Sequence, residues 1–214
     1  MIAIVDYGVG NLFSLGSSLK RLDIDYVITN ELAVLQKADQ ILLPGVGAFG
    51  DAKQKLDDTG LTQPLIDLAK AGKPLLGICL GMQLLFESSD EFGHHKGLGL
   101  IKGQVSSLSA ALKEIGSDLK VPHIGWNELE IADQASPLLK DTTAEESFYY
   151  VHSFYATNCE SELVGYSEYG VHVPGIVQNG NVFGTQFHPE KSGQAGLKLL
   201  KAFSEVTNEN LSSN

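Results

Sequence analysis

One of the two cysteines lies where the local sequence favours a reactive thiol. Cys79 belongs to the stretch PLLGICLGMQLL, residues 74–85, in which an apolar strand-like run changes directly into an apolar helix-like pattern. The motif G-x-C-x-G is the cysteine form of the nucleophile elbow, a tight strand-to-helix turn. Gly77 and Gly81 would allow backbone contacts that a Cβ atom prevents, and the helix N-terminus would favour the thiolate. The alternative is a buried cysteine that packs between strand and helix.

A histidine and a carboxylate far downstream could complete the chemistry of Cys79. His188 follows a strand-like run in NVFGTQFHPEKS, residues 181–192, and Pro189 favours extended geometry before it. In an extended segment residues i and i+2 point to the same side, so Glu190 should accompany His188. A nucleophile, a base and a carboxylate that orients the base form a triad. His188 would remove the thiol proton and later donate it to a leaving amine, while Glu190 fixes the imidazole tautomer.

The other histidines and the second cysteine are not expected to take part in the chemistry. His152 is the main rival of His188 as a base, but no carboxylate stands two residues after it, so a structural or interface role is favoured. The spacing of the histidines and cysteines offers no zinc site, and we expect neither a metal nor a cofactor. Cys159 is interpreted as structural.

A glycine-rich loop follows an earlier strand-like run. Residues 45–50, GVGAFG, match the pattern G-x-G-x-x-G, which could form a dinucleotide-binding turn. That fingerprint requires an acidic residue at the end of the next strand, where this chain has Cys79 instead. The better interpretation is an oxyanion hole, in which backbone N–H groups face the negative charge that grows on a substrate oxygen. One donor would be the N–H of Leu80, directly after the nucleophile, and a second would come from this loop.

The elements that must position these residues alternate in the first half of the chain. Short β-type runs are predicted at Ile2–Val5, Tyr26–Thr29, Gln40–Leu43 and Leu75–Ile78, with helix-type spacing at Leu12–Leu22, Leu32–Lys37 and Leu61–Ala71. This alternation predicts a mainly parallel sheet with helices on both faces. The second half is strand-rich. Its predicted elements are strands Val173–Gln178 and Val182–His188, joined by a hairpin at Asn179-Gly180, and a closing helix over Ser192–Val206 with Ser192 as N-cap.

Composition excludes several classes of function. The chain has 214 residues and a net charge of −11, and Arg21 is its only arginine. Nucleic-acid binding needs clustered Lys and Arg, so we expect no nucleic-acid partner. No apolar run approaches the roughly 20 residues of a membrane span, and the first residues lack a signal-peptide pattern. Isolated cysteines fit a reducing compartment, so we expect a cytoplasmic protein that does not bind membranes.

The motifs together resemble the class I (triad) glutamine amidotransferases, whose signatures are G-x-C-x-G-x-Q and a late H-P-E. Within them, six blocks are most similar to the glutaminase subunits of imidazole glycerol phosphate synthases. The blocks are DYGVGNL (6–12), PGVGAFG (44–50), GICLGMQ (77–83), VPHIGWN (121–127), YYVHSF (149–154) and GTQFHPEKS (184–192). The resemblance implies one amidotransferase domain, residues 1–214, with a flavodoxin-like α/β fold, a mixed and mainly parallel sheet, and added antiparallel strands.

The resemblance also implies roles for individual residues. The second oxyanion donor would be the N–H of Val46 or Gly47. Gln83, Ser153 and Phe154 would contact bound glutamine. A set of residues at the mouth would face a partner protein: Asn11, Trp126, Tyr149 and Lys191.

The function implied is hydrolysis of L-glutamine to glutamate and delivery of ammonia to a cyclase subunit, in a heterodimer that serves histidine biosynthesis and acts as a lyase. Three alternatives stay open at this point. They are a glutaminase for anthranilate or pyridoxal phosphate synthesis, a stand-alone cysteine hydrolase of the same fold, and a catalytically silent binding module. Since Gly45 and Gly47 flank the oxyanion donor, we expect the isolated chain to hold that donor turned away, and partner docking to turn it inward.

Overall fold

Short apolar segments, four from the first half of the chain and one from near its end, form the parallel part of an eight-stranded sheet. The computed structural model describes residues 1–143, 145–207 and 211. The strands of the parallel part are β1 (Ile2–Val5), β2 (Tyr26–Thr29), β3 (Gln40–Leu43), β4 (Leu75–Ile78) and β14 (Val182–Thr185). The strand order is β2-β1-β3-β4-β14-β13-β12-β9. The first four strands have the predicted boundaries, so the mixed and mainly parallel sheet is confirmed.

The other end of the sheet is antiparallel. It contains β13 (Val171–Asn179), β12 (Leu163–Tyr169) and β9 (Glu130–Ile131). The predicted hairpin joins β13 to β14, with Asn179 paired to Val182 and Gly180 at φ +57°. Strand β14 ends at Thr185, so the prediction that the strand continues to His188 was wrong. The chain leaves the ladder before His188, whose backbone N–H donates to the Tyr149 carbonyl instead.

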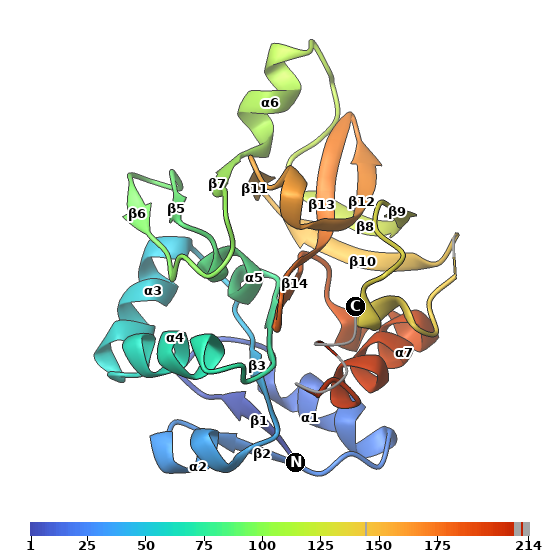
Figure 1. Ribbon diagram of the computed structural model, residues 1–214. Coiled ribbons are helices and arrows are strands. Elements are labelled where there is room, and N and C mark those ends of the chain that lie inside the picture. Colours follow the sequence, from blue (N-terminus) through green and yellow to red (C-terminus); the bar gives the residue numbers. More distant parts are fainter. Residues whose placement is uncertain (144, 208–210, 212–214) are drawn as a thin grey trace.

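Helices cover both faces of the sheet (Figure 1). Helices α3 (Phe49–Asp58) and α4 (Thr62–Lys70) lie on one side, and α1 (Leu12–Arg21) and α7 (Gly193–Ser204) lie on the other. Helix α2 (Leu32–Lys37) follows β2. The helices predicted around α1, α2, α4 and α7 are present to within one or two residues at each end. Helix α3 was not predicted from the sequence.

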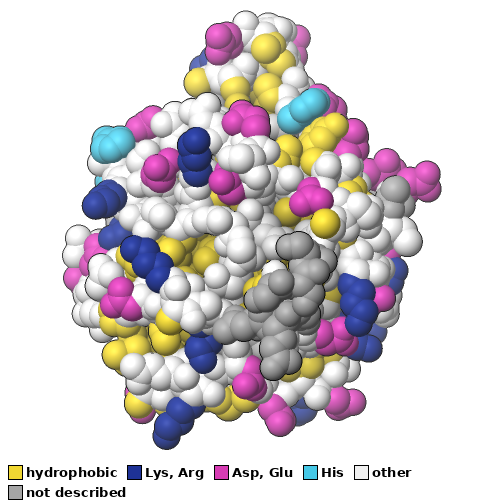
Figure 2. Space-filling view, viewed as in Figure 1, with side chains coloured by type: hydrophobic (Ala, Val, Ile, Leu, Met, Phe, Trp, Pro, Cys, Tyr) yellow, Lys and Arg dark blue, Asp and Glu magenta, His cyan; other side chains and the backbone are white. Residues whose placement is uncertain are grey.

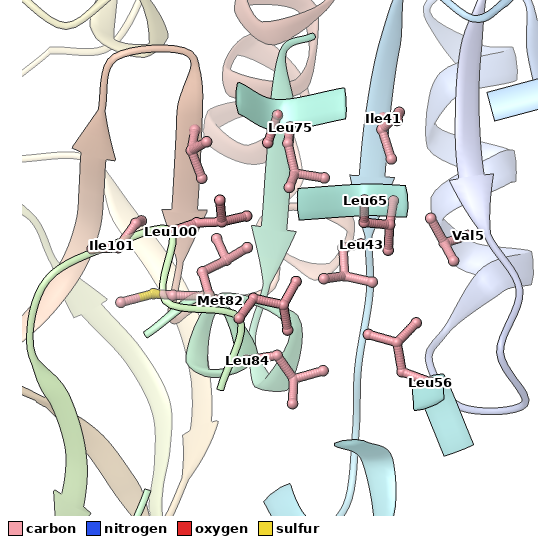
Figure 3. Packing of buried hydrophobic residues seen from close by; sticks show 14 of the residues in the cluster. Val5, Ile41, Leu43, Leu56, Leu65, Leu75, Met82, Leu84, Leu100 and Ile101 are labelled. Atoms are coloured by element: carbon pink, nitrogen blue, oxygen red, sulfur yellow. The ribbon is translucent and has the colours of Figure 1, made fainter. Parts of the chain in front are cut away.

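Alternation along the strands produces two hydrophobic cores. In β1, Ala3 and Val5 belong to the core under α3 and α4, while Ile2 and Ile4 belong to the core under α1 and α7. Period-two alternation of side chains across a strand is the cause. Figure 3 shows the first core, in which Met82 and Leu84 pack beside strands β3 and β4. Full burial of a leucine side chain stabilises the fold by roughly 1.5–3 kcal/mol.

Two smaller sheets stand above the carboxyl ends of the parallel strands. Strand β10 (Ser147–His152) pairs with β8 (His123–Glu128). The order of the other sheet is β11-β7-β5-β6, with β11 at Phe154–Thr157, β7 at Gln104–Ser107, β5 at Ser88–Ser89 and β6 at His95–Lys96. Helix α6 (Leu108–Glu114) follows β7, and 3-10 turns span Pro137–Leu139, Glu160–Glu162 and Pro189–Lys191. These segments enclose the end of the main sheet that holds Cys79.

The charged surface is mixed. On the face in Figure 2, Lys and Arg side chains are interspersed with Asp and Glu side chains. Within the part of the chain that the structure describes, no helix is both long and apolar enough to cross a membrane.

Candidate active site

Cys79 occupies the strained turn between β4 and helix α5 (Leu80–Leu85). Its backbone has φ 56° and ψ −113°, a conformation that L-residues rarely adopt outside functional turns. The two flanking glycines are required by close backbone packing. A Cβ on Gly81 would lie 1.8 Å from the Leu43 carbonyl oxygen, and one on Gly77 would lie 2.6 Å from the Gly81 oxygen. The structure thus agrees with the elbow predicted from G-x-C-x-G.

His188 and Glu190 form a buried pair beside Cys79. Nδ1 of His188 lies 2.7 Å from Oε1 of Glu190, and the two side chains are only 3% and 1% exposed. Burial lowers the pKa of His188, but hydrogen bonds to Cys79 and Glu190, together with the negative charge of both, outweigh it and hold the pKa above 6.5. With Nδ1 engaged by Glu190, Nε2 is the nitrogen left for the sulfur. The three predicted triad residues therefore meet.

The local reason for the contact between His188 and Glu190 differs from the one predicted. His188 is extended, with φ −96° and ψ 101°, but Glu190 lies in the 3-10 turn Pro189–Lys191 and not in an extended segment. Ser192 occupies the N-cap position of α7, as predicted, but its side chain makes no cap hydrogen bond. Ser192 Oγ instead donates to the His188 carbonyl and accepts the Tyr149 N–H, at 2.6 and 2.9 Å. These bonds join His188 to β10.

A cavity of about 310 Å³ opens over Cys79. It lies at the carboxyl ends of the parallel strands, the usual position of ligand sites in open α/β sheets. Its lining brings together the thiol, the imidazole, the glycine-rich loop and β10–β11: Val46, Gly47, Cys79, Leu80, Gln83, Glu91, Pro122, Val151, His152, Ser153, Phe154 and His188. Its volume suits a small metabolite.

The predicted oxyanion donors do not face the cavity together in this conformation. The Leu80 N–H donates to the Gly45 carbonyl at 3.3 Å, so a carbonyl oxygen occupies the position expected for the oxyanion. In a trans peptide the C=O and N–H point in opposite directions, which turns the Val46 N–H away. Gly47 has φ +94°, and Tyr7 Oη donates to the Pro44 carbonyl at 2.6 Å, holding the base of the loop. The arrangement matches the donor-out state expected for the isolated chain.

The profile of the family "Glutamine amidotransferase class-I" matches residues 3–205 of this chain. The chain belongs to the class-I glutamine amidotransferase family. This match covers the elbow, the glycine-rich loop and the His188 segment together, so the resemblance inferred from the motifs is confirmed.

Relatives of this amidotransferase are similar over almost their whole length. The chain is 49% identical over 211 residues to "Imidazole glycerol phosphate synthase subunit HisH" of Bacillus licheniformis, covering 98% of each chain. The protein of the same name from Bacillus subtilis is 47% identical over 211 residues, again with 98% of each chain covered. A solved structure described as a glutamine amidotransferase superposes with a TM-score of 0.73 at 18% identity, covering 96% of this chain and 98% of the other. The flavodoxin-like fold is thus confirmed.

The amidotransferase places three of the four predicted interface residues in one cluster. The rings of Trp126 and Tyr149 lie 6.1 Å apart, and Lys191 Nζ lies 5.9 Å from the Tyr149 ring centroid. Trp126 is 58% exposed, although an isolated tryptophan is more often buried. Asn11 precedes α1 and is half-buried. Its neighbour Gly10 packs against Pro44, where a Cβ would lie 2.9 Å from the proline Cβ.

The predicted substrate-contacting residues line the cavity, and some of their polar groups already have protein partners. Gln83 Nε2 donates to the Phe154 carbonyl at 3.0 Å and to Gln186 Oε1 at 3.1 Å. The Ser153 carbonyl accepts the Leu108 N–H at 3.1 Å. The Gln83 nitrogen is therefore occupied, and its side-chain oxygen is left for a ligand.

Two residues near the cavity were missed by sequence reasoning. Gln186 is fully buried, and its Nε2 lies 4.0 Å from Cys79 Sγ. Residues two apart in an extended segment point to the same side, and this argument was used to place Glu190 beside His188. The same argument, applied to the residue two positions before His188, would have indicated Gln186. Glu91 is buried and its Oε2 accepts the Phe49 N–H at 2.9 Å. Burial raises the pKa of Glu91, partly offset by that bond. No local pattern marks Glu91, because it lies in the loop that follows β5.

His152 belongs to a buried chain of neutral histidines and not to the triad. Its Nδ1 donates to the Phe154 carbonyl at 2.9 Å, so its Nε2 accepts the Nδ1 hydrogen of His123, also at 2.9 Å. Burial lowers the pKa of His152 to about 3 and that of His123 to about 4. The expected structural role of His152 agrees with this geometry. Cys159 is buried in the first core, and its predicted structural role is likewise consistent.

We expect these histidines to destabilise the fold at mildly acid pH. Below pH 6.5 the unfolded chain binds protons that His152 and His123 cannot bind when folded, so stability falls as pH falls. Each histidine should cost about 2 kcal/mol between pH 7.5 and 5.0. Urea unfolding at both pH values should show a smaller difference for His152→Gln than for the wild type. The exposed His172 supplies the control, His172→Gln, which should leave the difference unchanged.

Proposed function

We propose that this chain is the glutaminase subunit of an imidazole glycerol phosphate synthase. The observation that supports this most is the 49% identity to a HisH relative across 98% of both chains. All 214 residues would act as one amidotransferase domain, since the family match spans residues 3–205. The substrate would be L-glutamine, the partner a cyclase subunit that consumes ammonia, and the heterodimer a lyase of histidine biosynthesis.

In the proposed reaction Cys79 attacks the side-chain amide carbon of glutamine. His188 begins as the imidazolium partner of the thiolate, which its raised pKa supports. When the tetrahedral intermediate collapses, the C–N bond breaks and His188 donates a proton, so that ammonia leaves and a thioester remains. Water then adds to the thioester with His188 as base, the C–S bond breaks, and glutamate leaves. Glu190 holds the imidazole and stabilises its charged form.

The position of the glycine-rich loop supports dependence on a partner. While the Gly45 carbonyl accepts the Leu80 N–H, a substrate oxyanion would meet an oxygen instead of a donor. Rotation of the Gly45–Val46 peptide would release Leu80 and bring the Val46 N–H inward. Loss of one oxyanion donor typically costs about 10²–10³-fold in rate. A partner that favours the rotated state would therefore couple ammonia production to its own demand.

Glu91 would bind the α-ammonium group of glutamine. Glu91 is the one carboxylate among the described residues that line the cavity, and the rest of the lining includes uncharged groups such as Ser153 and Phe154. The oxygen of Gln83 would accept a further hydrogen bond from the substrate, and the β10–β11 backbone at Ser153 and Phe154 would shape the pocket.

Glu91→Gln should raise KM for glutamine by about 10–100-fold with little change in kcat, because a hydrogen bond to a charged group contributes roughly 1.5–3 kcal/mol. Steady-state glutamate release checks this. The matched control is Glu87→Gln, since Glu87 also accepts a backbone N–H, from Gly103 at 2.9 Å, but does not line the cavity. An unchanged KM for Glu91→Gln would remove Glu91 from the binding site.

The function is tested by adding the cognate cyclase subunit. We expect co-elution in gel filtration, and glutamate release that rises about 5–150-fold when the cyclase and its substrate are present. Trp126, Tyr149, Lys191 and Asn11 would lie in the interface, so Trp126→Ala should weaken co-elution. High and equal turnover without the cyclase would instead indicate a stand-alone hydrolase. Activation by an anthranilate or pyridoxal phosphate synthase subunit would indicate a sibling glutaminase.

A further inference from the structure

The side-chain amide of Gln186 lies between the nucleophile Cys79 and Gln83, both of which line the cavity. Gln186 is fully buried, just after β14 and two residues before His188. Its Oε1 accepts Gln83 Nε2 at 3.1 Å, and its Nε2 points to Cys79 Sγ at 4.0 Å. Buried amides of this kind are normally held by a complete set of partners.

The orientation of the Gln186 amide follows from the hydrogen bonds around it. The Phe154 carbonyl can only accept, so the Gln83 atom that contacts it is the nitrogen. The same Gln83 nitrogen contacts Gln186, which must present its oxygen there. The nitrogen of Gln186 is then the atom directed at the sulfur. The neutral chain from His123 through His152 also ends on the Phe154 carbonyl, which fixes that acceptor in place.

The sulfur has a second neighbour that opposes ionisation. Cys79 Sγ lies 3.9 Å from the Val151 carbonyl oxygen, to which a thiol can donate but which repels a thiolate. Without another donor, His188 alone would have to stabilise the thiolate against the repulsion of the Val151 carbonyl. A second N–H donor at the sulfur stabilises the charged form.

We propose that Gln186 is a catalytic residue, whose side-chain N–H hydrogen-bonds the Cys79 thiolate and keeps the sulfur charged against the Val151 carbonyl. The inference rests on Cys79 being the nucleophile of the proposed function. The bond acts at two steps. It raises the fraction of thiolate before attack. When the C–S bond of the thioester breaks and its electron pair returns to sulfur, the same hydrogen bond stabilises the thiolate that leaves.

Alkylation of Cys79 by iodoacetamide tests this without glutamine or a partner. In that reaction the thiolate displaces iodide, so its rate follows the thiolate fraction. Gln186→Met keeps the length of the side chain but removes the N–H. We expect its alkylation rate at pH 7 to fall about tenfold, with the midpoint of the pH–rate profile moved to higher pH. Gln186→Glu places a carboxylate against the sulfur and should move the midpoint further. Peptide mass spectrometry separates Cys79 from Cys159.

The control is Gln178→Met on β13, which removes an amide that donates to the Gly180 carbonyl away from the cavity. It should alkylate like the wild type. Gln186→Asn keeps an amide, but its shorter side chain withdraws the N–H from the sulfur. If Gln186→Met and Gln186→Glu do not fold, Gln186→Asn should show the same move of the pH–rate midpoint to higher pH. A wild-type pH–rate profile in any folded Gln186 variant overturns the inference. If Gln186→Met shifts the alkylation profile as expected but the wild-type chain releases no glutamate in the synthase complex, the proposed function fails. The contact between Gln186 and the Cys79 thiolate then still stands.

Discussion

Cys79→Ala abolishes glutamine hydrolysis in the synthase complex, with an expected loss of about 10⁴-fold or more, because removal of the nucleophile leaves only binding and oxyanion stabilisation. The same variant should keep the ammonia-dependent reaction of the complex when ammonium salt is supplied at alkaline pH. That reaction needs no thiol, and because free ammonia can reach the cyclase directly, docking is measured separately. Glutamate release and co-elution with the cyclase, measured on one preparation, separate a lost nucleophile from a lost fold.

The second cysteine provides the matched control. Cys159 is buried in the first core, and burial raises the pKa of its thiol to about 12, with Glu160 and Glu162 adding to the effect. Cys159→Ala should therefore keep glutaminase activity and lose only a modest amount of stability. Activity in Cys79→Ala above about one hundredth of the wild type would mean that another group attacks the amide.

Glu190→Gln is expected to reduce kcat by about 10²–10⁴-fold, in line with the effect of neutralising the carboxylate of other triads. The carboxylate lies 2.7 Å from His188 Nδ1 and its charge raises the pKa of His188. Its removal should lower that pKa, so the imidazolium–thiolate pair would be lost at a lower pH. The alkaline limb of the activity profile should move to lower pH, which a simple loss of packing would not produce.

A second histidine–carboxylate pair on the surface serves as the control for Glu190. Glu168 Oε2 lies 3.1 Å from His172 Nε2, and both side chains are more than half exposed. Glu168→Gln removes a similar pair in water and should change neither kcat nor the pH profile. A Glu190→Gln enzyme with an unchanged alkaline limb would show that Glu190 does not act through the charge of His188.

Local pattern was sufficient for much of the fold. The strands β1 to β4 were predicted with their boundaries, since short apolar runs between helix-type segments favour buried parallel strands. The elbow could also be predicted, because a turn this tight requires glycine on both sides, as the 1.8 Å approach at Gly81 shows. Helix α3 was missed although Phe49, Ala52 and Leu56 have helical spacing, because the preceding glycine pattern had been interpreted as a loop.

Residue types and order connected Cys79 with His188 and Glu190, and the structure brings these three side chains together, but their local geometry differs from the one predicted. The 3-10 turn at Pro189–Lys191 and the anchoring of His188 by Ser192 depend on β10, which lies some forty residues away in the chain. Contacts between segments that are so far apart in the chain leave no pattern in the local sequence.

Residue types and their spacing identify the groups that could do chemistry here: a thiol in an elbow, an imidazole, and a carboxylate two residues after it. The surroundings of these groups depend on the folded chain. Glu91 reaches the cavity from the loop after β5, the Gly45 carbonyl accepts the Leu80 N–H, and Gln186 is oriented by Gln83. Burial and hydrogen-bond direction are properties of neighbours in space, and these neighbours come from segments that are distant in the chain.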